Sequence, residues 1–115
     1  MTPAVTILQL DTDFPRIPGD VGCKETYRDD VEILRIPGAS VGQIVSANPS
    51  EIAIAPFEAA VDVAQGDVIV TSCGFLAYWQ GHLVKRTRKT FISSALMALP
   101  GLCAHYDPKE ILTVT

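Results

Sequence analysis

The sequence has 115 residues, with nine basic and 13 acidic side chains and a formal net charge of −4. Hydrophobic residues occupy 48% of positions and charged residues 19%, a composition that predicts one globular domain and rules out an intrinsically disordered chain. The acidic balance argues against nucleic acid as a partner, because no excess of Lys and Arg is present to neutralise phosphates.

The N-terminus and the cysteines indicate the cellular compartment. The first ten residues lack a basic segment and are followed by Asp11, so they do not predict a signal peptide. No apolar run approaches the roughly 18 to 20 residues that span a bilayer. Three cysteines, Cys23, Cys73 and Cys103, show neither zinc-site spacing nor an even number. We expect free thiols, no metal site, and a cytoplasmic protein without membrane contact.

Five short aliphatic or β-branched runs predict strands, with helices between some of them. The strands are expected, in chain order, at 5–10, 31–36, 67–72, 91–93 and 111–114. The run at 67–72 does not alternate, which is typical of a central parallel strand buried on both faces. Residues 14–30 read as a long binding loop, and 39–54 fit either a helical turn or an extended segment. Alternating strands and helices predict an α/β fold with a mostly parallel sheet.

The helices are marked by their boundaries. Pro56 stands at a first helical position and Gly66 follows the end of a predicted three-turn helix. A second helix is expected over 76–84, ending in the basic run 85–89. A third is expected from Ala95, disrupted by Pro100 or Gly101.

The most informative motif is Thr71-Ser72-Cys73-Gly74-Phe75, where a buried strand is expected to end and a helix to begin. Ligands of open parallel sheets bind at that edge. The free backbone N–H groups there favour a thiolate and a substrate carboxylate, and Gly74 allows a close approach of the backbone. The alternative is that Cys73 is a small buried apolar residue.

The residues around Cys73 can be compared with the motifs of other cysteine enzymes and of nucleotide-binding proteins. A phosphatase-type loop needs arginine six residues after the cysteine, where Trp79 stands, and a hydrolase elbow needs glycine two residues before it, where Thr71 stands. The sequence also has no phosphate-binding glycine motif. These activities are not supported.

Three motifs together resemble the N-terminal half of the aspartate/glutamate racemase superfamily. They are Leu10-Asp11-Thr12-Asp13-Phe14-Pro15-Arg16 with Pro18-Gly19-Asp20, then Thr71-Ser72-Cys73-Gly74-Phe75-Leu76, then Ser93-Ser94 before Pro100. The resemblance implies a cofactor-independent enzyme of two similar α/β halves facing one another across a cleft. Each half contributes one cysteine, which removes or delivers a proton next to a carboxylate.

Carried onto this sequence, the resemblance makes Cys73 the catalytic acid/base of the first half. It implies contacts with a small carboxylate or amino-acid substrate at Asp11, Ser72, Gly74, Phe75, Ser93 and Ser94. We expect 1–107 to form the N-terminal domain and 108–115 to begin a second half. The second cysteine motif is absent, and Cys103 stands in the wrong context to replace it, a core cysteine on a helix face being the expected role.

The leading hypothesis is an amino-acid racemase-like isomerase that lacks its second half. The alternatives are a single-cysteine decarboxylase, which needs only one proton donor, and a non-catalytic carboxylate-binding or assembly module. The missing half is expected to leave an apolar patch that a homodimer covers. His82 and His105 have no partner at ligand spacing, and Asp11, Asp13 and Asp20 are expected to be solvated or capping groups.

Overall fold

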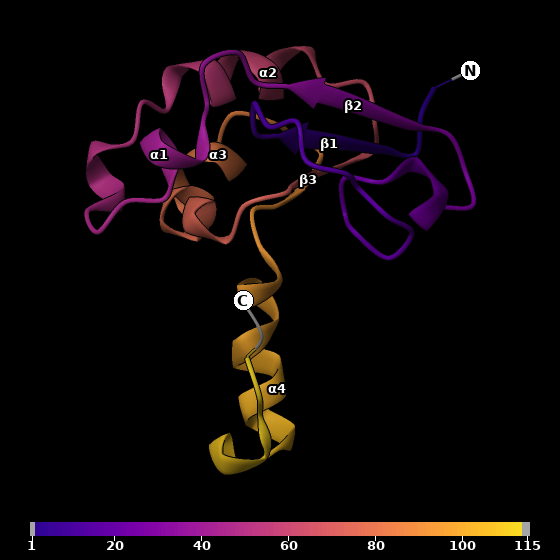
Figure 1. Ribbon diagram of the computed structural model, residues 1–115. Helices are drawn as coiled ribbons and strands as arrows, with labels where there is room; N and C mark the ends of the chain where they lie inside the picture. Colours follow the sequence, from indigo (N-terminus) through magenta and orange to yellow (C-terminus); the bar gives the residue numbers. More distant parts are fainter. Residues whose placement is uncertain (1, 114–115) are drawn as a thin grey trace.

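The computed structural model describes residues 2–113, which form a four-stranded parallel sheet with flanking helices (Figure 1). The strands are β1 (Val5–Gln9), β2 (Val31–Arg35), β3 (Val68–Thr71) and β4 (Thr90–Ile92). Their order in the sheet is β2-β1-β3-β4, and each neighbouring pair is parallel. The predicted α/β fold is confirmed, and four of the five predicted strands lie within a residue or two of their expected positions.

The two inner strands owe their place to continuous apolar runs. Ile7 and Leu8 of β1 are adjacent, so their side chains point to opposite faces, and both are fully buried. Ile69 of β3 is also fully buried. The run predicted as the central strand is therefore one of the two inner strands.

Helices pack mainly against the face that carries Leu8 and Ile69. These are α1 (Val41–Ile44), α2 (Ala55–Val63) and α3 (Gln80–Val84), whereas α4 (Leu99–His105) buries no residue. The 3₁₀ turns lie at Lys24–Thr26, Pro49–Glu51, Gly74–Trp79, Ala95–Ala98 and Pro108–Glu110. Phe57 of α2 and Leu83 of α3 are fully buried in the same cluster as these two strand residues. The predicted helix over 76–84 is instead a 3₁₀ turn followed by α3.

A close backbone approach fixes the turn between α2 and β3. Gly66 N–H donates to Thr6 Oγ1 at 2.8 Å, and Thr6 Oγ1 donates to Glu32 Oε1 at 2.8 Å. A Cβ on Gly66 would lie 2.5 Å from Thr6 N and 2.6 Å from the Val5 carbonyl carbon. Only glycine therefore fits this position.

We predict that Gly66→Ala lowers the free energy of unfolding by about 3 kcal/mol, because the clash is with backbone atoms that cannot rotate away. Gly81→Ala is the matched control, since nothing lies within 4 Å of its Cβ and alanine is the better helix former. Urea unfolding of both variants measures the difference. Equal stability of Gly66→Ala and the parent protein would contradict the packing described.

At the β4 edge of the sheet, one side-chain amide bonds two backbone groups. Gln80 Nε2 donates to the Phe91 carbonyl oxygen at 2.7 Å, and Gln80 Oε1 accepts from Ser93 N–H at 2.7 Å. Gln80 thus occupies the hydrogen-bonding groups that edge strand β4 would otherwise leave open to another chain.

We predict that Gln80→Leu destabilises the fold by about 1 to 3 kcal/mol, because two backbone groups lose their partner. Gln65→Leu, at an exposed position, should change stability far less. Equilibrium unfolding compares the pair. A Gln80→Leu variant as stable as Gln65→Leu would show that the amide does not support β4.

Residues 95–113, called here the C-terminal arm, project from the sheet layer (Figure 1). The arm's 3₁₀ turns and α4 contain no buried residue. Pro100 lies in the first turn of α4, where its missing N–H costs nothing, so it begins the helix that it was expected to disrupt.

The fifth predicted strand is not present where the structure describes the chain. Residues 111–113 lie outside regular secondary structure, and residue 114 is outside the described residues. The division into 1–107 and 108–115 stays a prediction. The segment 39–54 holds α1 and one 3₁₀ turn, and the long loop contains another. Within residues 2–113, no helix is long and apolar enough to cross a membrane.

Candidate functional site

The strand order creates a crevice at the carboxyl edge of the sheet. From β1 the chain moves to β2 on one side and later to β3 on the other, so the direction of winding reverses between β1 and β3. Ligands of open α/β sheets bind at such a point. Leu10 N–H donates to Ser72 Oγ across it at 3.3 Å.

Thr71, the last residue of β3, ties the ends of β3 and β4 together. Its hydroxyl group donates to the Ser93 carbonyl oxygen, and Thr71 Oγ1 also accepts from Cys73 N–H at 3.3 Å. A Cβ on Gly74 would lie 3.5 Å from Ser94 Oγ, so the Ser94 hydroxyl group lies on the side of Gly74 that a side chain would occupy. Cys73 and Ser94 thus stand at the same edge of the sheet, each just beyond the end of its strand.

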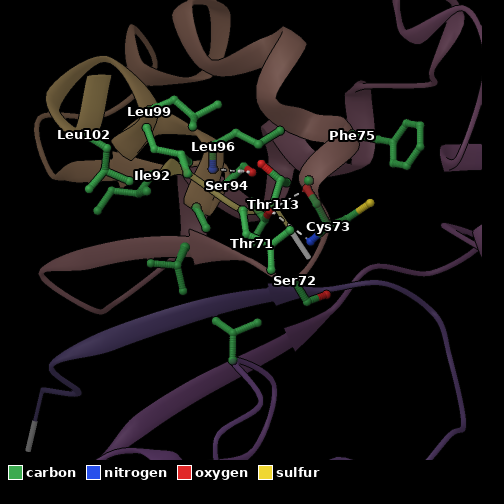
Figure 2. A pocket seen from close by; sticks show the side chains of 16 residues that line it. Thr71, Ser72, Cys73, Phe75, Ile92, Ser94, Leu96, Leu99, Leu102 and Thr113 are labelled. Carbon is green, nitrogen blue, oxygen red and sulfur yellow. Dashed lines mark hydrogen bonds between the residues drawn. The ribbon is translucent and has the colours of Figure 1, made fainter. Parts of the chain in front are cut away.

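A cavity of 910 Å³ opens beside these residues (Figure 2). Its lining comes from four parts of the chain: Val21 in the long loop; Val70, Thr71, Ser72, Cys73, Gly74 and Phe75 at the end of β3; Ile92, Ser94, Ala95, Leu96, Leu99 and Leu102; and Ile111, Leu112 and Thr113. The volume suits a small molecule with an apolar part.

Cys73 is a buried thiol at this cavity, with 7% of its surface exposed. Burial raises the pKa of the Cys73 thiol, and the nearby backbone N–H groups of Phe75 and Leu76 offset part of the rise. The expected thiolate is therefore corrected: desolvation outweighs the two N–H donors, and the thiol is protonated at neutral pH.

We predict that iodoacetamide labels Cys103 fastest at pH 7, because Cys103 is exposed and Cys23 and Cys73 are buried. Labelling of Cys73 should be slow and should increase only well above the ordinary thiol pKa of about 8.5, as the thiolate forms. Mass mapping of each peptide from pH 7 to 10 measures the rates. Cys73 labelled first at pH 7 would contradict the direction of its pKa shift.

The structure brings together five of the seven predicted site residues: Ser72, Cys73, Gly74, Phe75 and Ser94 all line the cavity. Ser93 is not part of the lining, since its side chain is fully buried and its Oγ has no hydrogen-bond partner among the described residues.

Asp11 also lies outside the lining and has structural partners instead. It accepts from Arg35 Nε at 2.6 Å and from Gly38 N–H at 3.1 Å. Its hydrogen bond with Arg35 lowers the pKa of the Asp11 carboxyl. The Asp11 carboxylate thus holds the turn after β2.

The other polar candidates have local partners. Cys23 donates to Glu25 Oε2 at 2.9 Å, and this bond raises the pKa of the Cys23 thiol. Cys103, expected to be a core residue, is exposed on the arm. His82 Nε2 lies 2.9 Å from Glu58 Oε2. Across residues 2–113, no group of three or more His, Cys, Asp or Glu side chains is arranged to hold a metal ion.

Sequence reasoning missed the wall that the arm contributes. Leu96, Leu99, Leu102 and Leu112 line the cavity, whereas the sequence patterns predict a helix that is disrupted at Pro100 or Gly101 and a strand at 111–114. The available signal was the row of leucines at 96, 99 and 102, three residues apart, which places them on one side of a helical segment.

Comparison with known proteins gives one informative likeness. No protein-family model matches the sequence, and no solved structure matches it significantly. The chain is 29% identical, over 102 residues, to a dimethylsulfoniopropionate lyase of Durusdinium sp. clade D. The aligned region is 85% of this chain and 34% of that protein, so the chain spans about a third of the relative's length.

This likeness corrects the functional hypothesis. The expected amino-acid racemase, an isomerase, is wrong, because the matched relative is named as a lyase. The resemblance to the racemase superfamily in the three motifs is a separate matter and stays a prediction.

Proposed function

We propose that the chain carries the proton-transferring half-site of a lyase that acts next to a carboxylate, with Cys73 as the acid/base. The likeness to a dimethylsulfoniopropionate lyase carries this proposal. The aligned region extends over 85% of the chain, and Cys73, which lines the cavity, would supply the proton-transferring group that such a reaction requires.

The reaction of the relative's substrate follows from its structure. A base takes a proton from the carbon next to the carboxylate, and the electron pair of that C–H bond forms a C=C bond as the C–S bond breaks. Dimethyl sulfide leaves with the bonding pair, and acrylate remains. Cys73 as thiolate would take the proton and return it to solvent. Its raised pKa makes this form scarce at neutral pH, so the rate should increase with pH.

A second candidate is favoured by the protonated resting state of Cys73. In a decarboxylation of a malonate-type acid, the C–C bond to CO₂ breaks and its electron pair stays on the substrate carbon. The Cys73 thiol would then donate its proton to that carbon, and solvent would reprotonate the thiolate. This reaction needs the thiol form, so its rate should fall at high pH.

We predict opposite pH profiles for the two reactions and loss of activity by at least 100-fold in Cys73→Ser. Dimethyl sulfide release from dimethylsulfoniopropionate and CO₂ release from an alkylmalonate are measured from pH 6 to 10. Cys103→Ser is the matched control, because that thiol is exposed on the arm. A rate rising through the Cys73 pKa supports elimination, and a falling rate supports decarboxylation.

Activity retained in Cys73→Ser would contradict the assignment of this thiol. No reaction with either substrate, in a protein shown to be folded, would contradict the lyase proposal for this chain.

A further inference from the structure

The two faces of the sheet are covered to different extents. The face with Leu8 and Ile69 packs against helices. On the opposite face, Gly22 of the long loop lies against Gln9, since a Cβ there would be 2.9 Å from Gln9 Oε1. Over β3 and β4 the same face is open: Val70 is half-buried and Ile92 is 40% exposed. The 910 Å³ cavity begins there and continues past the ends of these strands.

The cavity has a polar end at the strand termini. Ser94 Oγ accepts from Leu96 N–H at 3.0 Å, and in the hydrogen bonds of the described residues it acts only as an acceptor. Its O–H is therefore available to donate to a ligand. Cys73, with its protonated thiol, is a second neutral donor in the lining of the same cavity. Two neutral donors at one end of a cavity suit the oxygens of a carboxylate.

The other end of the cavity is aliphatic. Leu96, Leu99 and Leu102 of the arm face Ile92 of β4, and Figure 2 shows Leu99, Leu102 and Ile92 on the opposite side of the view from Cys73 and Phe75. Leu112 also lines the cavity and is largely exposed. All sixteen lining residues in the described part of the chain are uncharged.

We infer that the cavity binds a carboxylic acid with an uncharged aliphatic body, with the carboxylate at Cys73 and Ser94 and the hydrocarbon along the leucines of the arm. The inference rests on the proposed function only in placing the carboxylate next to Cys73. Of the two reactions proposed above it favours the decarboxylation, and it names the substrate class as an acid with a medium-chain alkyl body rather than a sulfonium acid, because the lining beyond the polar end offers contacts to methylene groups and none to a charge.

The test is a chain-length series. The dissociation constants of butanoate, hexanoate, octanoate and decanoate are measured by calorimetry on the full chain with Cys73 intact, since these saturated acids carry no leaving group and are not turned over. Affinity should increase about two- to fourfold per added methylene, the upper value being that of a fully buried methylene. Octanol should bind more weakly than octanoate, because it lacks the second oxygen.

Two substitutions and one control variant locate the effect. Leu102→Asn should flatten the chain-length dependence, whereas Val63→Asn, on the exposed side of α2 and outside the lining, should leave it unchanged. Gly74→Ala should weaken all the acids by a similar factor, because its methyl group would lie beside Ser94 Oγ.

Three results would overturn the inference: affinity independent of chain length, octanol binding as tightly as octanoate, or equal effects of Leu102→Asn and Val63→Asn. Self-association that Leu102→Asn abolishes, together with no acid binding, would assign the cavity to a second copy of the chain. Because binding is measured without turnover, failure here leaves the lyase assay as an independent test of the proposed function.

Discussion

The hydroxyl group of Thr71 is the interaction on which the candidate site depends. It joins the carboxyl ends of β3 and β4 by donating to the Ser93 carbonyl oxygen and accepting from Cys73 N–H. The bond fixes where the chain leaves both strands and hence where Cys73 and Ser94 stand relative to each other. Thr71 is buried, so water does not compete for this bond. The site is built from backbone geometry first and from side-chain chemistry second.

The same strand ends set the acid–base state of the thiol. Cys73 must be buried to follow β3 into the 3₁₀ turn that begins at Gly74, and burial raises its pKa more than two backbone N–H groups lower it. A protonated thiol beside a hydroxyl donor is neutral. The cavity therefore has a neutral polar part at the strand ends and an aliphatic part at the leucines of the arm. This pair of surfaces suits an aliphatic acid, which is the ligand that we infer for the proposed lyase.

Local patterns predicted the sheet well and the arm poorly. Continuous apolar runs identify β1 and β3, because a strand that is buried on both faces needs apolar residues at consecutive positions. Thr71 to Phe75 were recognised for the same reason, since the motif follows such a run. The arm has no continuous apolar run of this kind, because its helix buries no residue and its leucines line a cavity. The pKa of the Cys73 thiol depends on burial by segments distant in the sequence, so the spacing of residues around it could not predict the direction of the shift. The pairing of Asp11 with Arg35, 24 residues away, could not be predicted from spacing either.

The most direct measurement is a two-dimensional ¹H–¹⁵N NMR titration of the full chain with octanoate. The account predicts that amide shifts concentrate at residues 73–75, at 94–102 and at 111–113, the segments that line the cavity from the strand ends and the arm. Shifts confined to the separate hollow beside Gly38 and Ile44, or no saturable shifts at millimolar octanoate, would contradict the claim that the carboxyl edge of this sheet is a ligand site.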